Sequence, residues 1–153
     1  MCSSDLFAHR IADDVTSRFA AGELPLRAPA SDAGDAAVLD ASHRLDLQRA
    51  MTRGSGPVRS AASTAGALEA LAALAAEPPS TAEPGPATWE TTNLLHLGQA
   101  LSLVAHRREE TRGGHVRSDF PERDDAHWLL HLTTTRPAAG ALVVTERPVE
   151  TPA

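Results

Sequence analysis

The sequence predicts a mainly α fold, an antiparallel three-helix bundle (spectrin-repeat-like) that is preceded by one separate helix and followed by a short C-terminal β-hairpin. Three observations support this fold class. Apolar residues recur at helical spacing in four segments, prolines and glycines collect between those segments, and β-branched residues gather in two short runs near the end of the chain. The chain has 153 residues, of which 3% are aromatic, so we expect one lean core built from Leu, Val and closely packed Ala.

Two helices are predicted in the first third of the chain. The first runs over residues 6–21 and stops at Gly22, and its apolar positions lie at near-helical spacing: Phe7, Ile11, Val15 and Phe19. Residues 23–35 contain prolines, a glycine and small residues, which indicates an irregular linker. The second helix is expected over residues 35–51, before the sequence RGSG breaks it, with one side formed by Val38, Leu39, Ser42 and Leu45.

Two longer helices are predicted to pack against each other. Pro57 suits the first position of a helix that reaches Ala76, with a small-residue stripe made of Val58, Ala61, Ala65, Leu68, Ala72 and Ala75, flanked by Leu71 and Leu74. The proline-rich segment 77–87 ends it. Thr88 is the expected N-cap of a last helix that ends near Glu110 and carries an apolar stripe of Leu94, Leu97, Leu101 and Val104. We therefore expect these two helices to be antiparallel and joined by the proline-rich loop.

The last 30 residues predict a change from helix to strand. Residues 124–128 suit a single helical turn. The runs HLTTT and ALVVTERPV, separated by RPAAG, predict a β-hairpin because both are rich in β-branched residues.

Charge and hydropathy exclude two classes of partner. The formal net charge is −6 and the arginines alternate with acidic residues, which argues against a nucleic-acid partner. The sequence has neither an apolar run of membrane-spanning length nor a signal peptide, so we expect no membrane partner and a cytoplasmic protein.

Two short motifs invite a functional interpretation that we weigh against a structural one. Gly54-Ser55-Gly56 resembles part of a dinucleotide loop, but it follows a helical pattern and lacks a third glycine, so a turn between helices is favoured. His127 and His131 have the spacing of metal ligands on a helix, yet a strand that begins at Leu129 would break this geometry, and two interfacial histidines are the favoured alternative. No nucleophile elbow is present. We therefore expect neither a catalytic residue nor a metal site.

The segment 107–131, RREETRGGHVRSDFPERDDAHWLLH, is the most informative part of the sequence. It concentrates arginines and carboxylates around a double glycine and is flanked by Phe120 and Trp128. One interpretation is a solvated loop with weak surface ion pairs. The other is an interface where arginine side chains bind carbonyls or carboxylates of another domain, and the flanking aromatics favour it.

At these residues the sequence resembles the C-terminal domain shared by L-aspartate oxidase and the flavoprotein subunits of succinate dehydrogenase and fumarate reductase. The family pattern Arg-x-Glu-Ser/Thr-Arg-Gly-x-His-x-Arg-x-Asp-x-Pro is similar to RREETRGGHVRSDFP at 107–121. Further upstream, QRAMTRGSGPVR at 48–59 resembles a family helix followed by a Gly-x-x-Arg turn. TNLLHLGQALSLVAHRREE resembles the last long helix of the family, and FAHRIADDV resembles the helix that closes the flavin-binding domain.

The resemblance implies a function for a parent enzyme and a docking role for this chain. The sequence TTNLL and the short spacing from Arg59 to the motif favour the L-aspartate oxidase branch, in which FAD oxidises L-aspartate to iminoaspartate for NAD biosynthesis. A fragment of a succinate dehydrogenase or fumarate reductase flavoprotein and a free-standing helical docking protein without catalysis remain alternatives. By resemblance, a docking motif braces the helical domain against the FAD-binding domain: Arg59, Arg108, Glu109, Arg112, Gly113, Gly114, His115, Arg117 and Asp119.

The resemblance also implies that the catalytic and cofactor-binding parts belong before this chain. We therefore expect the chain alone to be inactive and to bind no FAD, with the missing FAD-binding and capping domains of the same polypeptide as its partners. The first six residues, MCSSDL, can be encoded by GTG-TGC-TCT-TCC-GAT-CTN, a common sequencing-adapter sequence. The expected organisation is an adapter artefact at 1–6, the terminal helix of the FAD-binding domain at 7–22, a linker at 23–35, the C-terminal helical domain at 36–147 and a tail at 148–153.

Overall fold

The computed structural model describes residues 3–23, 37–137 and 141–149. The described residues fall into two compact units: residues 3–23 belong to the first, and residues 37–137 and 141–149 belong to the second. The described part is mainly helical, with an antiparallel β-hairpin near the C-terminal end, as the sequence predicts. The predicted linker and tail lie almost entirely outside the described residues.

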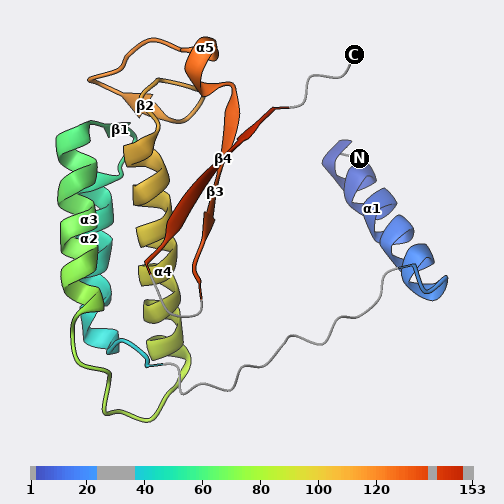
Figure 1. The fold of residues 1–153 in the computed structure, drawn as a ribbon. Helices are drawn as coiled ribbons and strands as arrows, with labels where there is room; N and C mark the ends of the chain where they lie inside the picture. The colour runs from blue at the N-terminus through green and yellow to red at the C-terminus, as the bar shows by residue number, and fades with distance from the viewer. Residues whose placement is uncertain (1–2, 24–36, 138–140, 150–153) are drawn as a thin grey trace. The chain divides into compact units, whose positions relative to one another are not determined.

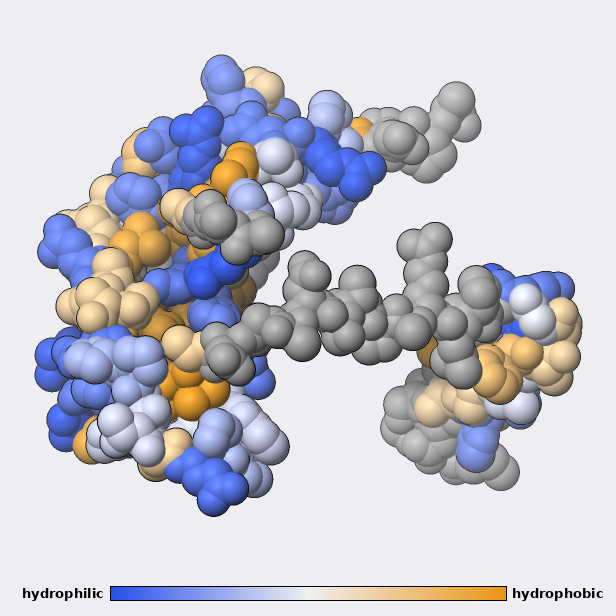
Figure 2. Space-filling view, turned by 60° about the horizontal axis from the view of Figure 1, so that its bottom comes forward, coloured by the Kyte–Doolittle hydropathy of each residue, from blue (hydrophilic) through white to orange (hydrophobic). Residues whose placement is uncertain are grey.

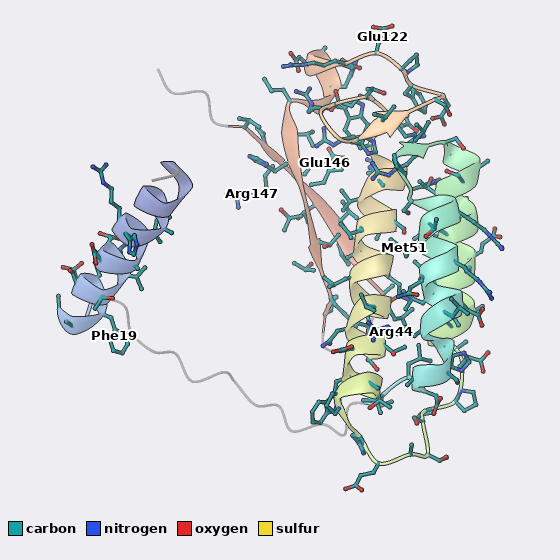
Figure 3. All side chains as sticks on the ribbon, turned by 180° about the vertical axis from the view of Figure 1, so that it is seen from behind. Phe19, Arg44, Met51, Glu122, Glu146 and Arg147 are labelled. Carbon is teal, nitrogen blue, oxygen red and sulfur yellow. The ribbon has the colours of Figure 1, made fainter. Side chains whose placement is uncertain are left out.

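The first unit contains helix α1 (Ser3–Ala20), which confirms the first predicted helix and begins three residues earlier. The turn after the helix contains Gly22, which has a φ of +73°, a left-handed conformation that favours glycine. Three apolar side chains of α1 are exposed within the unit: Ile11, Val15 and Phe19. Figure 3 shows Phe19 projecting from the C-terminal end of this helix.

The second predicted helix begins nine residues later than expected. Residues 37–40 are not helical, and Asp40 caps a short 3-10 helix, η1 (Ala41–His43), by accepting the Ser42 N–H. Helix α2 (Arg44–Gly54) follows directly and ends at the predicted RGSG break. The expectation of a helix from residue 35 was wrong because the Asp40 side chain satisfies backbone N–H groups there and sets the start. Leu45, expected on the buried side, is exposed.

The third helix begins at Ala61, not at Pro57. Strand β1 (Val58–Arg59) occupies the expected first turn, and Ser60 forms a capping box with Ser63 at the start of helix α3 (Ala61–Ala75). In this box the Ser60 hydroxyl accepts the Ser63 N–H, and the Ser63 hydroxyl accepts the Ser60 N–H. Both backbone N–H groups at the start of α3 therefore have a partner. The buried positions of α3 are Thr64, Ala67 and Leu71, whereas Val58, Ala61, Ala72 and Ala75 of the predicted stripe are exposed.

The last long helix, α4 (Pro86–Arg107), likewise differs from the prediction at its start and on its buried face. Gly85 is the N-cap, and Thr88 is the third helical residue, whose hydroxyl accepts the Gly85 N–H. The buried positions are Thr88, Thr91, Leu95, Gly98 and Ser102. Leu97 and Leu101, which belong to the predicted apolar stripe, are 60% and 62% exposed.

Helices α2, α3 and α4 pack side by side, and the hairpin runs along α4 (Figure 1). Their shared core is small and contains Leu39, Leu47, Leu71 and Leu95. Gly98 permits a close approach, since a Cβ there would lie 3.1 Å from the Met51 sulfur. Hydrophobic side chains also reach the surface of this unit, where Figure 2 shows them as orange areas among hydrophilic ones.

Two small sheets complete the second unit among the described residues. Strand β2 (Val116–Arg117) pairs in parallel with β1, with Val58 opposite Val116 and Arg59 opposite Arg117. The single turn α5 (Asp125–Trp128) leads into β3 (Leu130–Thr135), which pairs antiparallel with β4 (Val143–Pro148). These elements confirm the predicted helical turn and the predicted hairpin.

Candidate functional site

The candidate site is the loop network between the C-terminal end of α4 and the start of β3, at residues 108–125. The β1–β2 pairing holds this loop against the start of α3, and the Ser118 N–H extends the pairing by donating to the Arg59 carbonyl at 2.8 Å. Figure 3 shows Glu122 pointing outward at the far end of the loop, whereas Glu110 and Arg117 are buried. The network therefore has a solvated rim and a partly buried interior.

Arg117 is the centre of the network and is 1% exposed. Its guanidinium donates to the carbonyls of Ala105, His106 and Arg108 at 3.1, 3.2 and 2.8 Å, which are the last carbonyl groups of α4 and its cap residue. A cation at this position also complements the helix dipole. The Phe120 ring lies 4.9 Å from the guanidinium carbon.

Asp119 pairs with Arg117 and connects it to a second helix. Two nearly parallel bonds, from Nε and Nη2 of Arg117, reach the carboxylate at 2.8 and 2.9 Å. The same carboxylate accepts the N–H of Ala61, the first residue of α3, at 2.7 Å. The hydrogen bonds from Arg117 lower the pKa of Asp119 far below its usual range, so it is ionised at neutral pH.

Glu110 is a second, fully buried centre in this loop. It accepts hydrogen bonds from Arg108, from Nε and Nη2 of Arg112 at 2.8 and 3.1 Å, and from the Asp124 N–H at 3.0 Å. Burial alone would raise the pKa of Glu110, but the bonds from Arg112, Asp124 and Arg108 outweigh it and lower the pKa to about 2. The ionised carboxylate of Glu110 therefore binds both Arg108 and Arg112, whose positive charges would otherwise repel each other.

Arg108 connects the network to the β3–β4 hairpin. It donates to the carbonyls of Trp128 and Leu130 at 2.9 and 2.7 Å, and its guanidinium lies 5.5 Å from the centre of the Trp128 ring. Arg112 reaches Asp125 at the start of α5. The loop, α4 and the hairpin are therefore joined through charge-assisted bonds.

His115 lies between two arginine-bearing segments. The Arg59 guanidinium lies 3.1 Å from Nδ1, and the Arg108 carbonyl lies 3.2 Å from Nε2. We assign the tautomer with its proton on Nε2, because an arginine can only donate to Nδ1. Burial, followed by the charges of Arg59, Arg117 and Arg108, lowers the pKa of His115.

The structure brings most of the predicted docking residues together at one end of the second unit. Gly113 has a φ of +55°, which requires glycine at the turn between Arg112 and His115, and Gly114 is exposed beside it. Glu109 is exposed and makes no hydrogen bond among the described residues, whereas the neighbouring Glu110 is the buried acceptor. The signal was present in the sequence, because the Arg-x-Glu spacing counted from Arg108 leads to Glu110.

Many hydrogen bonds of this network join residues of this chain to each other. This changes both interpretations that the sequence offered for the segment, a solvated loop and an interface with another domain. The loop is not merely solvated, since Glu110 and Arg117 are buried. Its arginines bind carbonyls and carboxylates of their own unit. Whether the outer rim also contacts another domain remains a prediction.

The Gly54-Ser55-Gly56 motif lies at a contact between two helices. Gly54 does not begin a phosphate cradle, because a Cβ there would lie 2.3 Å from Ala67 Cβ, so this glycine serves the contact of α2 with α3. His127 and His131 lie on α5 and β3, and His127 binds the carboxylate of Asp124. Within the described ranges no group of three His, Cys, Asp or Glu side chains could hold a metal ion. None of the described helices is long and apolar enough to cross a membrane.

A match to a family model shows the class of this protein: a C-terminal domain of a flavoprotein. Residues 44–153 match the family described as "Fumarate reductase flavoprotein C-term", and the chain belongs to this family. The resemblance drawn from the sequence is thereby confirmed.

Individual relatives match different shares of the chain. It is 42% identical to an L-aspartate oxidase of Streptomyces coelicolor over 141 residues, which cover 83% of this chain and 24% of that protein. A fumarate reductase flavoprotein subunit of Mycobacterium tuberculosis is 43% identical over 60 residues, or 39% of this chain and 10% of that protein. The chain thus spans about a quarter or less of the length of these relatives.

Solved structures agree on the fold. Sdh1 of Mycobacterium smegmatis, in complex with UQ1, matches 71% of this chain and 20% of its own chain with a TM-score of 0.61 and 28% identity. The FrdA chain of E. coli quinol fumarate reductase gives the same TM-score at 22% identity, covering 74% of this chain and 21% of that one. At 22% identity, the match to the E. coli chain is evidence for the fold only.

Proposed function

We propose that this chain is the C-terminal helical domain of an L-aspartate oxidase, an FAD-dependent enzyme that oxidises L-aspartate to iminoaspartate in NAD biosynthesis. The observation that carries the proposal is the extent of the similarity. The match to the Streptomyces coelicolor oxidase covers 83% of the chain, whereas the match to the fumarate reductase subunit covers 39%. The larger share exceeds residues 44–153, so the alignment includes residues before Arg44.

In this proposal the chain supplies structure, not chemistry. The partners are the FAD-binding and capping domains of the parent polypeptide, which hold the flavin and the aspartate. Helices α2, α3 and α4 form an antiparallel three-helix bundle of the spectrin-repeat kind, and the loop at 108–125 fixes its end. The internal bonds of Arg117 and Glu110 support this role, because they hold the loop in one shape before any partner binds.

A hybrid enzyme tests the proposal. The segment of the Streptomyces coelicolor oxidase that aligns with this chain is replaced by this chain, and aspartate-dependent peroxide formation and fumarate reduction are measured. We expect the hybrid to bind FAD and to oxidise aspartate but not succinate, and the 153-residue chain alone to do neither. A hybrid with succinate activity, or an isolated chain that copurifies with flavin, would contradict the proposal.

A further inference from the structure

An exposed apolar row on α4 ends at an arginine that lacks a carboxylate. The row follows the apolar stripe that the sequence predicts, in which Leu94 and Val104 are half-buried and Leu97 and Leu101 are exposed. Leu97 and Leu101 are 60% and 62% exposed, so no described element of the second unit covers them. Such a row of leucines on one helix face is typical of a surface that binds a protein partner.

The end of this row is a cavity of about 240 Å³ between α2, α4 and the loop. Its apolar walls include Met51, Leu101 and Val104, and its polar side is formed by Arg59, Arg108 and His115. Figure 3 shows Met51 between α2 and α4, where its sulfur lies 3.5 Å from the Ser102 hydroxyl. The cavity therefore combines an apolar wall with a cationic side.

Arg59 differs from the other arginines that are partly or fully buried in the described part of the chain. Arg44, Arg108, Arg112 and Arg117 each have a carboxylate within 4.0 Å. Among the described residues, none lies that close to Arg59, whose contacts are the Ser55 and Gly114 carbonyls at 3.4 and 3.5 Å and His115 Nδ1 at 3.1 Å. All three acceptors are neutral, and the first two lie at the long limit of a hydrogen bond.

From this charge imbalance we infer that the cavity at Arg59 receives a carboxylate side chain of a partner segment whose apolar residues cover Leu97 and Leu101. The inference deepens the proposed function, since the flavin-binding part of the parent enzyme would supply that segment. A carboxylate would provide the charge-assisted bonds that Arg59 lacks, and apolar neighbours would remove the leucines from water. An acidic side chain within an apolar stretch is therefore the chemistry that this surface selects.

The first experiment tests the chemistry of the cavity on the 153-residue chain, with hexanoate as the probe. Hexanoate combines a carboxylate with an apolar chain, while 1-hexanol and hexylamine keep the chain and change the charge. In an NMR titration at constant ionic strength we expect saturable shifts at Arg59, His115 and Leu101 with hexanoate only. Arg59→Gln should weaken hexanoate binding about 10-fold, as the loss of one charge-assisted interaction does.

Two further variants keep this experiment interpretable. Arg49→Gln removes an exposed arginine of α2 that pairs with Asp46, and it should leave hexanoate binding unchanged. Leu101→Gln alters an exposed wall residue without touching the core, and it should weaken binding about 3-fold. Equal binding of hexanoate and 1-hexanol, or an Arg59→Gln variant that is folded and binds normally, would overturn the inference.

The second experiment tests where the carboxylate comes from. Phenylglyoxal modification of arginines, mapped by mass spectrometry, is compared between the free chain and the hybrid oxidase. Arg59 should react in the free chain and be protected about 10-fold in the hybrid, while Arg49 reacts equally in both. If Arg59 stays reactive in a hybrid that oxidises aspartate, and hexanoate then protects it, the cavity serves a free carboxylate and the docking inference fails. A hybrid without oxidase activity in which Arg59 is protected would refute the proposed function alone.

Discussion

Arg117 and Asp119 form a two-bond ion pair that joins the end of α4 to the start of α3. Arg117 binds the last carbonyls of α4, and Asp119 accepts the first N–H of α3, so the pair satisfies backbone groups at two helix ends that have no partner within their own helices. The geometry requires a planar guanidinium, because one side chain reaches three carbonyls and both carboxylate oxygens.

We predict that Arg117→Lys lowers the free energy of unfolding by about 3 kcal/mol, because the substitution breaks a buried, hydrogen-bonded pair. Urea unfolding followed by circular dichroism at pH 7 measures the change. Arg123→Lys is the matched control, since Arg123 is exposed and pairs only with Asp125, and it should change the value by less than about 0.5 kcal/mol. Equal effects of the two substitutions would show that the helix-end bonds are unimportant.

The neighbouring glutamates offer a second, sharper comparison. Glu110→Gln should destabilise the second unit by about 3 kcal/mol, because it leaves Arg108 and Arg112 without their shared carboxylate. Glu109→Gln changes an exposed side chain one position earlier and should be neutral within about 0.5 kcal/mol. Thermal and urea unfolding of both variants measure this, and a neutral Glu110→Gln would contradict the assigned role.

Acid should weaken the same network. The pKa of Glu110 is lowered to about 2 from an ordinary value of 4.5, so its contribution to stability is complete above about pH 4.5 and is lost as the pH falls toward 2. The pKa of Asp119 is lowered further, so this residue adds to the loss at the acidic end of that range. The urea midpoint of the native chain should fall steeply in this window, and that of Glu110→Gln should fall less. If the urea midpoints of the native chain and of Glu110→Gln fall equally as the pH is lowered, the role assigned to Glu110 is contradicted.

The elements that follow simple periodicity were predictable from the sequence. Helix α1 and the hairpin β3–β4 show uninterrupted spacing of apolar or β-branched residues, with a glycine or a Pro-Gly stretch at their ends. The start of α3 was not predictable from Pro57, because the reciprocal bonds of Ser60 and Ser63 set it.

The buried face of α4 could not be predicted from the hydropathy of its residues either. Its buried positions include Thr91 and Ser102, whose hydroxyls bind the Ala87 carbonyl at 2.8 Å and the Ser55 hydroxyl at 2.8 Å. Satisfied hydroxyl groups can be buried at low cost, so a hydropathy pattern does not identify these positions. In the loop, the motif pointed to residues that lie close together, and its Arg-x-Glu spacing counted from Arg108 leads to Glu110. That the Glu110 carboxylate also accepts the Asp124 N–H depends on how the loop folds, which the motif does not show.

His115 makes a pH prediction in a milder range. Its pKa is lowered from 6.5 by burial and by nearby arginines, so the folded chain binds protons less readily than the unfolded chain. Stability from this residue is therefore complete above about pH 6.5 and falls as the pH drops through its folded pKa. NMR titration of the His115 ring should give a pKa below 6.5 in the folded chain, and Arg59→Gln should raise it. A ring that titrates at or above 6.5 would contradict the described environment.

Two glycines in facing helices should respond to alanine in opposite ways. A Cβ at Gly54 would lie 2.3 Å from Ala67 Cβ and 2.6 Å from the Ser63 carbonyl oxygen, so Gly54→Ala must push α2 away from α3. We expect it to lower the free energy of unfolding by about 2 kcal/mol, as overpacking does. Gly66 lies within α3 with open space around its Cβ position, so Gly66→Ala should add about 0.5–1 kcal/mol through helix propensity. Urea unfolding decides the matter: if both variants are stabilised, the close contact of α2 and α3 at Gly54 does not exist.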